Sequence, residues 1–442
     1  MPDTADRRET LVRRAAIVLV SLLAAIGLVA ALTNLPADWL PTSETRATDP
    51  GQDSGTVAEA DAEEKAERRA ERRERRAEKR AEAEARQLAA KQAKQEARQK
   101  AKKKARKKAK KQAKAAAASA AANPLAGHRM GVYQGPGDQA WAPYERSTGV
   151  NRELLAKIAL RPKAKWFGAW IPDREIRGNV AAYIANSTGG DPDVLVQMTV
   201  FRMVPWEHAA CGRLPTPAEQ ASYKYWIDEF AAGVGSAHAA IVLQPDGPFA
   251  LCAPGGSRLP SELIKYAATK FAALPNTSVY IDGGAADWPK DNPAEAAEIL
   301  VRAGVDRVRG FALNSTHYVA LPDDIAFGTK VVAELARRGI GGKHFVINTS
   351  SNGRGFEFNL GRGSHPDNAN VCQTPQERVC VTLGIPPTVD VANPRWGLSP
   401  ELAAAAAEHV DAYLWFGRPW LHMQNDPFVL DRALAMARTT PW

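Results

Sequence analysis

Carboxylate side chains follow two of the strand-like runs in this chain of 442 residues. The apolar run 240–244 leads into a Pro-Asp-Gly turn that contains Asp246, and the run 278–282 ends in Asp282, shortly before Trp288. A carboxylic acid in partly apolar surroundings can donate a proton, and a second carboxylate can orient water. Pro-Asp-Gly is also a common turn sequence. The prediction of acid-base chemistry therefore depends on the elements around these residues.

Seven strand-like runs alternate with amphipathic helical stretches beyond residue 123. The runs are 165–170, 194–201, 240–244, 278–282, 310–314, 344–348 and 412–416; the helical stretches are 216–233, 261–273, 293–303, 323–338 and 399–409. This alternation predicts an α/β fold with a parallel sheet, and the number of units favours a distorted seven-stranded β/α barrel of the TIM type over an open sheet. Reactive groups in such barrels gather on the loops that follow the carboxyl ends of the strands.

The other side chains near the strand ends suit a neutral, polyhydroxylated ligand. Indole faces stack on sugar rings, while amides, carboxylates and guanidinium groups bond to hydroxyls. The candidates are Trp166, Trp288, Asn314, Asn348, Trp415, Arg418 and Trp420. Any single tryptophan is more simply read as a core residue, so the recurrence at strand ends carries the prediction of a saccharide site.

Several other chemistries lack their sequence patterns. We find no glycine-rich phosphate loop after a strand, no nucleophile elbow and no histidine or cysteine spacing typical of a metal site, so we expect neither a cofactor nor a metal. Residues 59–114 hold 23 Lys and Arg against 11 Asp and Glu, a net charge of +12 in a chain whose total is +9. The basic character therefore belongs to that segment, and nucleic acid is not an expected partner.

The first 122 residues suggest a membrane tether. Residues 15–33 are apolar and follow four arginines in residues 1–14, which predicts a cytoplasmic N-terminus and a single-pass anchor with the C-terminal domain outside the cell, or a cleaved signal with a secreted product. Residues 34–58 have linker composition. Residues 59–122 are rich in Ala, Glu, Lys and Arg without an apolar heptad stripe, which predicts a stalk, either helical or disordered, rather than a coiled coil. The Lys-rich half of the stalk could contact anionic envelope polymers.

Four cysteines, all beyond residue 210, are typical of an oxidising compartment. They allow three pairings, which the sequence alone does not distinguish. Cys211 and Cys252 follow consecutive strands on either side of Asp246, and Cys372 and Cys380 close a short loop, so we favour these two pairs.

The domain at 123–442 resembles glycoside hydrolase family 6, the inverting β-1,4-glucanases that include endoglucanases and cellobiohydrolases. The resemblance is carried by Trp166-Phe167, the segment 225–233, Val242-Leu243-Gln244-Pro245-Asp246, Tyr280-Ile281-Asp282, the segment 348–353 and Asp411-Ala412-Tyr413-Leu414-Trp415. It implies a distorted seven-stranded barrel, a polysaccharide substrate, a catalytic acid at Asp246 and disulfides between the same pairs of loops as those favoured above. We expect a monomer.

The chain departs from the family pattern around the acid. The signature Tyr corresponds to Arg202, and the Asp of Pro-x-Arg-Asp-Cys corresponds to His208 or Ala210, depending on the direction of counting. Glu207 is the carboxylate within reach, and we expect it, together with His208, to support Asp246.

Other family positions differ as well. The sugar-stacking Trp before the third cysteine is Val371, and the acidic end-piece is replaced by a segment whose nearest acid is Asp426. We expect Asp282 and Asp426 to orient water. Two alternatives remain: a barrel that binds envelope carbohydrate without cleaving it, and a protein whose stalk, as a tether, has the main role.

Overall fold

The computed structural model describes residues 123–356 and 368–442, together with residue 72 and several others up to 104 in the predicted stalk. The residues described between 86 and 104 are helical and exposed, and Arg86 is paired with Glu82 one turn earlier at 2.8 Å. The predicted segments 1–14, 15–33 and 34–58 lie outside the described residues. Within the described part of the chain, no helix has the length and apolar character needed to cross a membrane.

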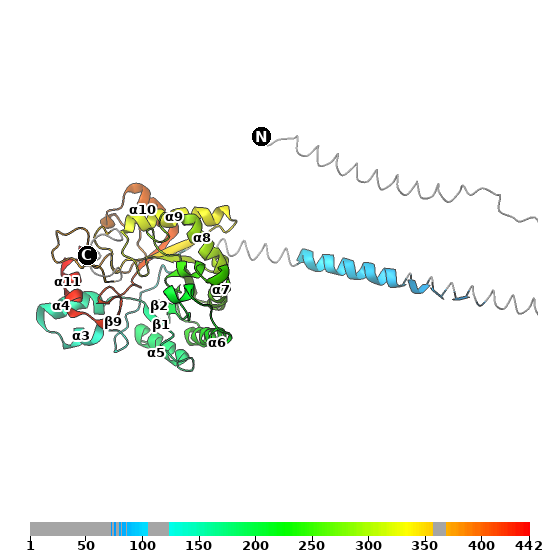
Figure 1. The fold of residues 1–442 in the computed structure, drawn as a ribbon, viewed down its shortest axis with the longest axis horizontal. Helices are drawn as coiled ribbons and strands as arrows, with labels where there is room; N and C mark the ends of the chain where they lie inside the picture. Colours follow the sequence, from blue (N-terminus) through cyan, green and yellow to red (C-terminus); the bar gives the residue numbers. More distant parts are fainter. Residues whose placement is uncertain are drawn as a thin grey trace, which may run out of the picture. The chain divides into compact units, whose positions relative to one another are not determined.

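Seven parallel strands form one curled sheet whose spatial order is the order of the chain (Figure 1). They are β1 (Lys165–Gly168), β2 (Val196–Phe201), β3 (Ala239–Leu243), β4 (Thr277–Asp282), β5 (Gly310–Leu313), β6 (His344–Asn348) and β7 (Val410–Leu414). All seven predicted strands are confirmed. Among the described residues β1 and β7 form no ladder, although Ala164 N–H donates to Trp415 O at 2.8 Å. The barrel is therefore open between its first and last strands, which corrects the expectation of a closed one.

Helices surround the sheet (Figure 1). They are α5 (Ile176–Thr188), α6 (Pro217–Val234), α7 (Leu259–Phe271), α8 (Pro293–Arg302), α9 (Leu321–Arg337) and α10 (Pro400–His409). The five predicted helices correspond to α6–α10, and α5 is an additional one. Their starts follow local rules: Thr216 and Glu219 form a reciprocal capping box at α6, and Ser399 caps α10 just before Pro400.

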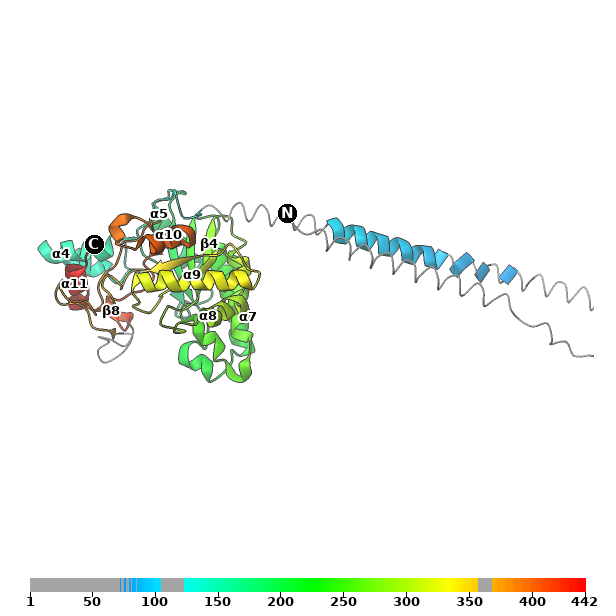
Figure 2. The ribbon, with the colours of Figure 1, turned by 90° about the horizontal axis from the view of Figure 1, so that it is seen from above.

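Alternation along the strands divides the apolar residues between two cores. Ala240 and Val242 of β3 point into the barrel with Tyr280 and Val346, whereas the intervening Ile241 packs against the outer helices. A third core lies under α4 (Gly149–Ala159) and α11 (Leu430–Thr439), which lie side by side in both views (Figures 1 and 2). The remaining elements are α3 (Trp141–Arg146), the 3₁₀ helices η1 (Glu207–Cys211), η2 (Gly247–Leu251), η3 (Pro254–Gly256), η4 (Val305–Arg307) and η6 (Pro394–Trp396), and the hairpin of β8 (Leu421–His422) and β9 (Asn425–Phe428).

Candidate active site

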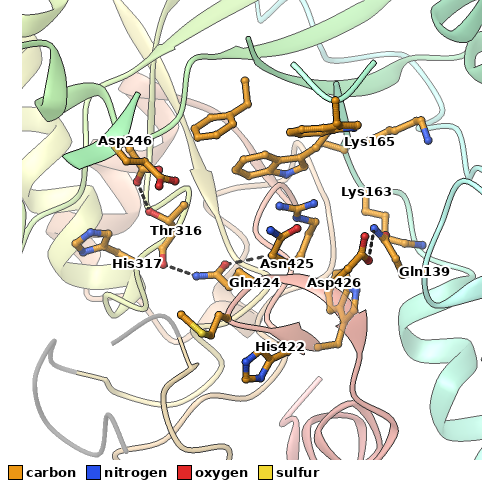
Figure 3. Close-up of a pocket in the computed structure, with 18 of the residues that line it drawn as sticks. Gln139, Lys163, Lys165, Asp246, Thr316, His317, His422, Gln424, Asn425 and Asp426 are labelled. Carbon is orange, nitrogen blue, oxygen red and sulfur yellow. Dashed lines mark hydrogen bonds between the residues drawn. The ribbon is translucent and has the colours of Figure 1, made fainter. Parts of the chain in front are cut away.

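A cleft of 1150 Å³ opens at the carboxyl ends of the strands (Figure 3). Its walls come from loops that follow β1, β2, β3, β4, β5 and β7, together with residues 133–139 near the start of the domain. Of the predicted catalytic and sugar-binding residues, seven line the cleft: Trp166, Glu207, Asp246, Trp288, Arg418, Trp420 and Asp426. Asp282, Asn314, Asn348 and Trp415 do not.

Asp246 lies at the edge of the cleft, immediately after β3, with its side chain half-buried. Thr316 Oγ1 donates a hydrogen bond to Asp246 Oδ1 at 2.7 Å (Figure 3). The pKa of Asp246 is raised to about 7, mainly by burial and also by the charges of Asp282 and Glu207, which the Thr316 hydrogen bond and the charge of His317 only partly oppose. A carboxyl group with this pKa is a proton donor near neutral pH.

The backbone around Asp246 adopts conformations that residues other than glycine rarely use. Gln244 and Asp246 both have left-handed φ angles, of 55° and 64°, and Glu207 on the neighbouring loop has a φ of 55°. Such conformations cost of order 1–3 kcal/mol each and persist only where the surrounding structure imposes them.

Asp282, at the end of β4, holds the Asp246 loop from behind. It is 1% exposed, and its Oδ1 accepts hydrogen bonds from the backbone N–H groups of Gly247 and Gly284, each at 3.0 Å. A Cβ atom on Gly247 would lie 2.3 Å from Asp282 O, so this close approach requires glycine. Ser315 Oγ also donates to Asp282, whose pKa burial raises to about 6. We therefore correct the expectation that Asp282 orients water, because its oxygens face the protein.

Glu207 and His208 lie on the loop after β2, both exposed and both lining the cleft. The disulfide Cys211–Cys252 joins this loop to the loop that carries Asp246, and Cys372–Cys380 closes the second predicted loop. Both favoured pairings are confirmed. The first of them connects the Glu207 loop to the Asp246 loop, and the charge of Glu207 acts on the candidate acid.

Arg202, at the position of the signature Tyr, does not line the cleft. Its side chain is buried and pairs with Asp173 at 3.0 Å, and its guanidinium also donates to Ser222 Oγ at 2.6 Å. This side chain thus has a structural role and leaves no phenol at the place where the family pattern has one.

The opposite wall of the cleft carries Trp166, Arg418 and Asp426. The Arg418 guanidinium lies 4.2 Å from the centroid of the Trp166 ring, and Trp166 Nε1–H donates to Phe416 O at 2.7 Å. Burial lowers the pKa of Arg418 to about 10, although the charge of Asp426 opposes this decrease. Asp426 is exposed and accepts a hydrogen bond from Gln139 at 3.3 Å (Figure 3).

Three predicted sugar-binding residues lie behind the cleft wall instead. Asn314 and Asn348 are fully buried and hydrogen-bond each other's backbone carbonyls at 3.2 and 2.9 Å. Trp415 is 2% exposed, and its Nε1–H donates to Ile385 O at 2.9 Å. Because these polar atoms are used within the protein, we correct the expectation that they contact sugar. Trp420 lines the cleft but is also only 2% exposed, so most of its ring belongs to the core.

Two residues that the sequence did not single out, His317 and Asp287, line the cleft with Asp246. His317 follows Thr316 after β5, and its Nδ1 lies 2.7 Å from Asp287 Oδ1, on the loop after β4. The His317 ring stacks on Trp288 with centroids 5.3 Å apart and an interplanar angle of 12°. The sequence signal for both residues is their place just past two strand ends, where a histidine without metal-ligand spacing carries no pattern of its own.

Comparisons with known proteins point to one family. The model of the family described as "Glycosyl hydrolases family 6" matches residues 132–419. Endoglucanase A of Cellulomonas fimi is 32% identical over 229 residues, which are 51% of this chain and 47% of that protein. Endoglucanase 1 of Streptomyces halstedii is 32% identical over 232 residues, covering 51% of this chain and 70% of that protein. The chain thus spans about half the length of the Cellulomonas relative.

A solved structure shows the same similarity. The endoglucanase Cel6 from Mycobacterium tuberculosis, in complex with a methyl-cellobiosyl-4-deoxy-4-thio-β-D-cellobioside, aligns with a TM-score of 0.57 and 27% identity. The alignment covers 72% of this chain and 99% of that chain.

Proposed function

This chain belongs to glycosyl hydrolases family 6, and from this premise we propose that it hydrolyses a β-1,4-linked glucan with inversion at the anomeric carbon. The observation that carries the proposal is Asp246, a cleft carboxyl group whose pKa is about 7 and which Thr316 Oγ1 orients. In the proposed reaction Asp246 gives its proton to the glycosidic oxygen, and water attacks the anomeric carbon from the other face of the sugar.

A second carboxylate must accept the proton of the attacking water. Asp426 is suited to this role because it is exposed and lies on the wall with Gln139 and Lys163, away from Asp246 (Figure 3). Glu207 lies on the loop that is cross-linked to the Asp246 loop, and its charge raises the pKa of Asp246. We assign Asp426 to orienting water and Glu207 to keeping Asp246 protonated.

The test is release of reducing sugar by the full chain from a panel of β-glucans, with Asp246→Asn as the variant. We expect the substitution to reduce turnover by about 10²–10⁴-fold, the usual contribution of a general acid, with binding of cello-oligosaccharides retained. Asp228→Asn, which changes an aspartate that bonds Tyr266 on the outer helices, is the matched control. The first-formed product should have the inverted anomeric configuration by NMR; a retained configuration would exclude the mechanism.

One observation favours a second candidate, a barrel that binds carbohydrate without cleaving it. Arg202 and His208 replace the Tyr and, counted from Pro205, the Asp of the family signature, and Arg202 is committed to Asp173. Such a protein would bind cello-oligosaccharides equally well with and without the Asp246 carboxylate, and the wild type would release no reducing sugar.

We also propose that the protein acts outside the cytoplasmic membrane, with residues 15–33 as anchor or signal. The disulfides Cys211–Cys252 and Cys372–Cys380 support an oxidising compartment. Fractionation of producing cells distinguishes a membrane-bound form from a secreted one, and recovery of the full chain in the cytosol alone would contradict both.

A further inference from the structure

His317 and Asp287 form a pair near the candidate acid. This pair has no role in the reaction proposed above. They come from the loops after β5 and β4, and their side chains are 13% and 17% exposed. Thr316, the residue before His317, makes the hydrogen bond to Asp246. One short segment therefore delivers both the hydroxyl that contacts the acid and the imidazole next to it (Figure 3).

The packing fixes the orientation of the imidazole. One face of the His317 ring stacks on Trp288, and the Asp287 carboxylate contacts Nδ1 at 2.7 Å. The contact to Asp287 also sets which nitrogen carries a proton in the neutral ring. Trp288 in turn contacts the Phe249 ring edge-on, with the ring centroids 5.0 Å apart. The Asp246 loop, which carries Phe249, therefore also supports the stacked rings of Trp288 and His317.

Three carboxylates act electrostatically on His317. Asp287, Asp246 and Asp282 face it from the loops after β4 and β3 and from the end of β4. Burial alone would lower the pKa of His317, but its hydrogen bond to Asp287 and these three charges outweigh burial and raise the pKa above the ordinary value. The imidazole is therefore held toward its positively charged form.

Asp246 has carboxylates on its other sides. Asp282 and Glu207 both disfavour its ionised form, and His317 is the positive group that favours it. When Asp246 has given up its proton, its negative charge stands beside those of Glu207 and Asp282. An adjacent imidazolium lowers the energy of that state.

We propose that His317, held by Asp287, is a positioning residue for Asp246: its imidazolium offsets the charge that Asp246 acquires each time it donates its proton. This inference rests on the proposed role of Asp246 as the acid. The residues that support Asp246 in this proposal lie on the loops after β4 and β5. The altered signature segment lies on the loop after β2 and contributes Glu207 and His208.

The experiment titrates Asp246 directly in the full chain labelled with ¹³Cγ-aspartate, with Asp246→Asn to assign the resonance. His317→Gln removes the positive charge, and Asp287→Asn weakens the hold on it, so both should raise the pKa of Asp246, the first by on the order of one unit for the loss of a nearby charge. His317→Lys restores a cation and should return the pKa toward the wild-type value. His344→Gln is the matched control, because His344 contacts Asp411 at 3.4 Å on the amino-terminal side of β6.

An unchanged Asp246 titration in both His317→Gln and Asp287→Asn would overturn the proposal. If His317→Gln does not fold, as judged by circular dichroism, Asp287→Asn decides the question alone. In turnover measurements, the alkaline limb of the pH profile of kcat/KM should move to higher pH, together with the pKa of Asp246 measured by NMR. A large loss of kcat at every pH with an unmoved limb would assign His317 to another role and overturn the proposal.

The NMR titration does not depend on turnover, so the two proposals fail separately. A wild type that releases no sugar, with an Asp246 pKa that moves in His317→Gln, rejects hydrolysis and supports the electrostatic coupling. A wild type that hydrolyses glucan, with an Asp246 pKa that stays in place, supports hydrolysis and rejects the role of His317.

Discussion

Two groups of residues that contain aspartates lie at opposite ends of the sheet and differ in their partners. Near the amino-terminal ends, Asp411 of β7 forms two hydrogen bonds with the Arg309 guanidinium, at 2.7 and 2.8 Å, and accepts a third from Tyr280 Oη at 2.7 Å. At the carboxyl ends, Asp246 accepts a hydrogen bond from a hydroxyl, and Asp282 accepts from another hydroxyl and from two backbone N–H groups; neither has a guanidinium partner among the described residues.

This difference in partners separates a carboxylate that stabilises the fold from carboxyl groups that can transfer protons. A carboxylate with a bidentate guanidinium partner stays ionised and joins strands together. Carboxyl groups that lie near one another away from water lose their protons less readily, and the pKa values of Asp246 and Asp282 are raised to about 7 and about 6. The sheet is thus fastened at one end and prepared for proton transfer at the other.

The largest expected effect is on stability, at the paired cluster. Asp411→Asn leaves the Arg309 charge buried without its partner, which should cost about 3–5 kcal/mol in the free energy of unfolding, measured by urea denaturation. Asp191→Asn removes an exposed partner of Arg129, at 3.6 Å, and should cost less than about 1 kcal/mol. Equal costs for the two variants would show that the Asp411 cluster does not fasten the sheet.

Asp246→Asn should have the opposite effect on stability at high pH. The pKa of Asp246 is raised on folding, from an ordinary value of 3.8 to about 7. A carboxyl group of this kind favours the folded state below pH 3.8, and this contribution is lost as the pH rises through 7. Asparagine does not titrate, so the melting temperature of the variant relative to wild type should increase between pH 4 and pH 8. Parallel melting curves would contradict the raised pKa.

The smallest effect is a shift in the pH profile from Asp282→Asn. Removing the negative charge of Asp282 should lower the pKa of Asp246, because that charge now raises it. The alkaline limb of the kcat/KM profile should then move to lower pH, opposite to the shift expected for His317→Gln. Ser315→Ala removes only the hydroxyl that bonds Asp282 and serves as the control. A shift to higher pH in Asp282→Asn would show that Asp282 acts on the loop geometry rather than through its charge.

Most of the barrel could be predicted because its signals are local. The seven apolar runs and the helices from α6 to α10 follow from periodicity, and Thr216 and Ser399 mark helix starts by capping. Helix α5 was missed because its sequence, IRGNVAAYIANST, has a glycine in its first turns and scatters its polar residues around the helix. The open edge between β1 and β7 depends on the curvature of the whole sheet, which no local pattern encodes.

The sequence by itself determined which residues stand at the strand ends, because chain order and strand polarity place them there, and it indicated the two disulfides. Only the tertiary structure decided which of these side chains face the cleft. Asn314, with a left-handed φ of 70°, turns into the protein, whereas Asp246, with a φ of 64°, lines the cleft. The direction of each side chain depends on loop conformation and on contacts from other loops, as with His317 and Asp287, which are 30 residues apart and meet only in the folded chain.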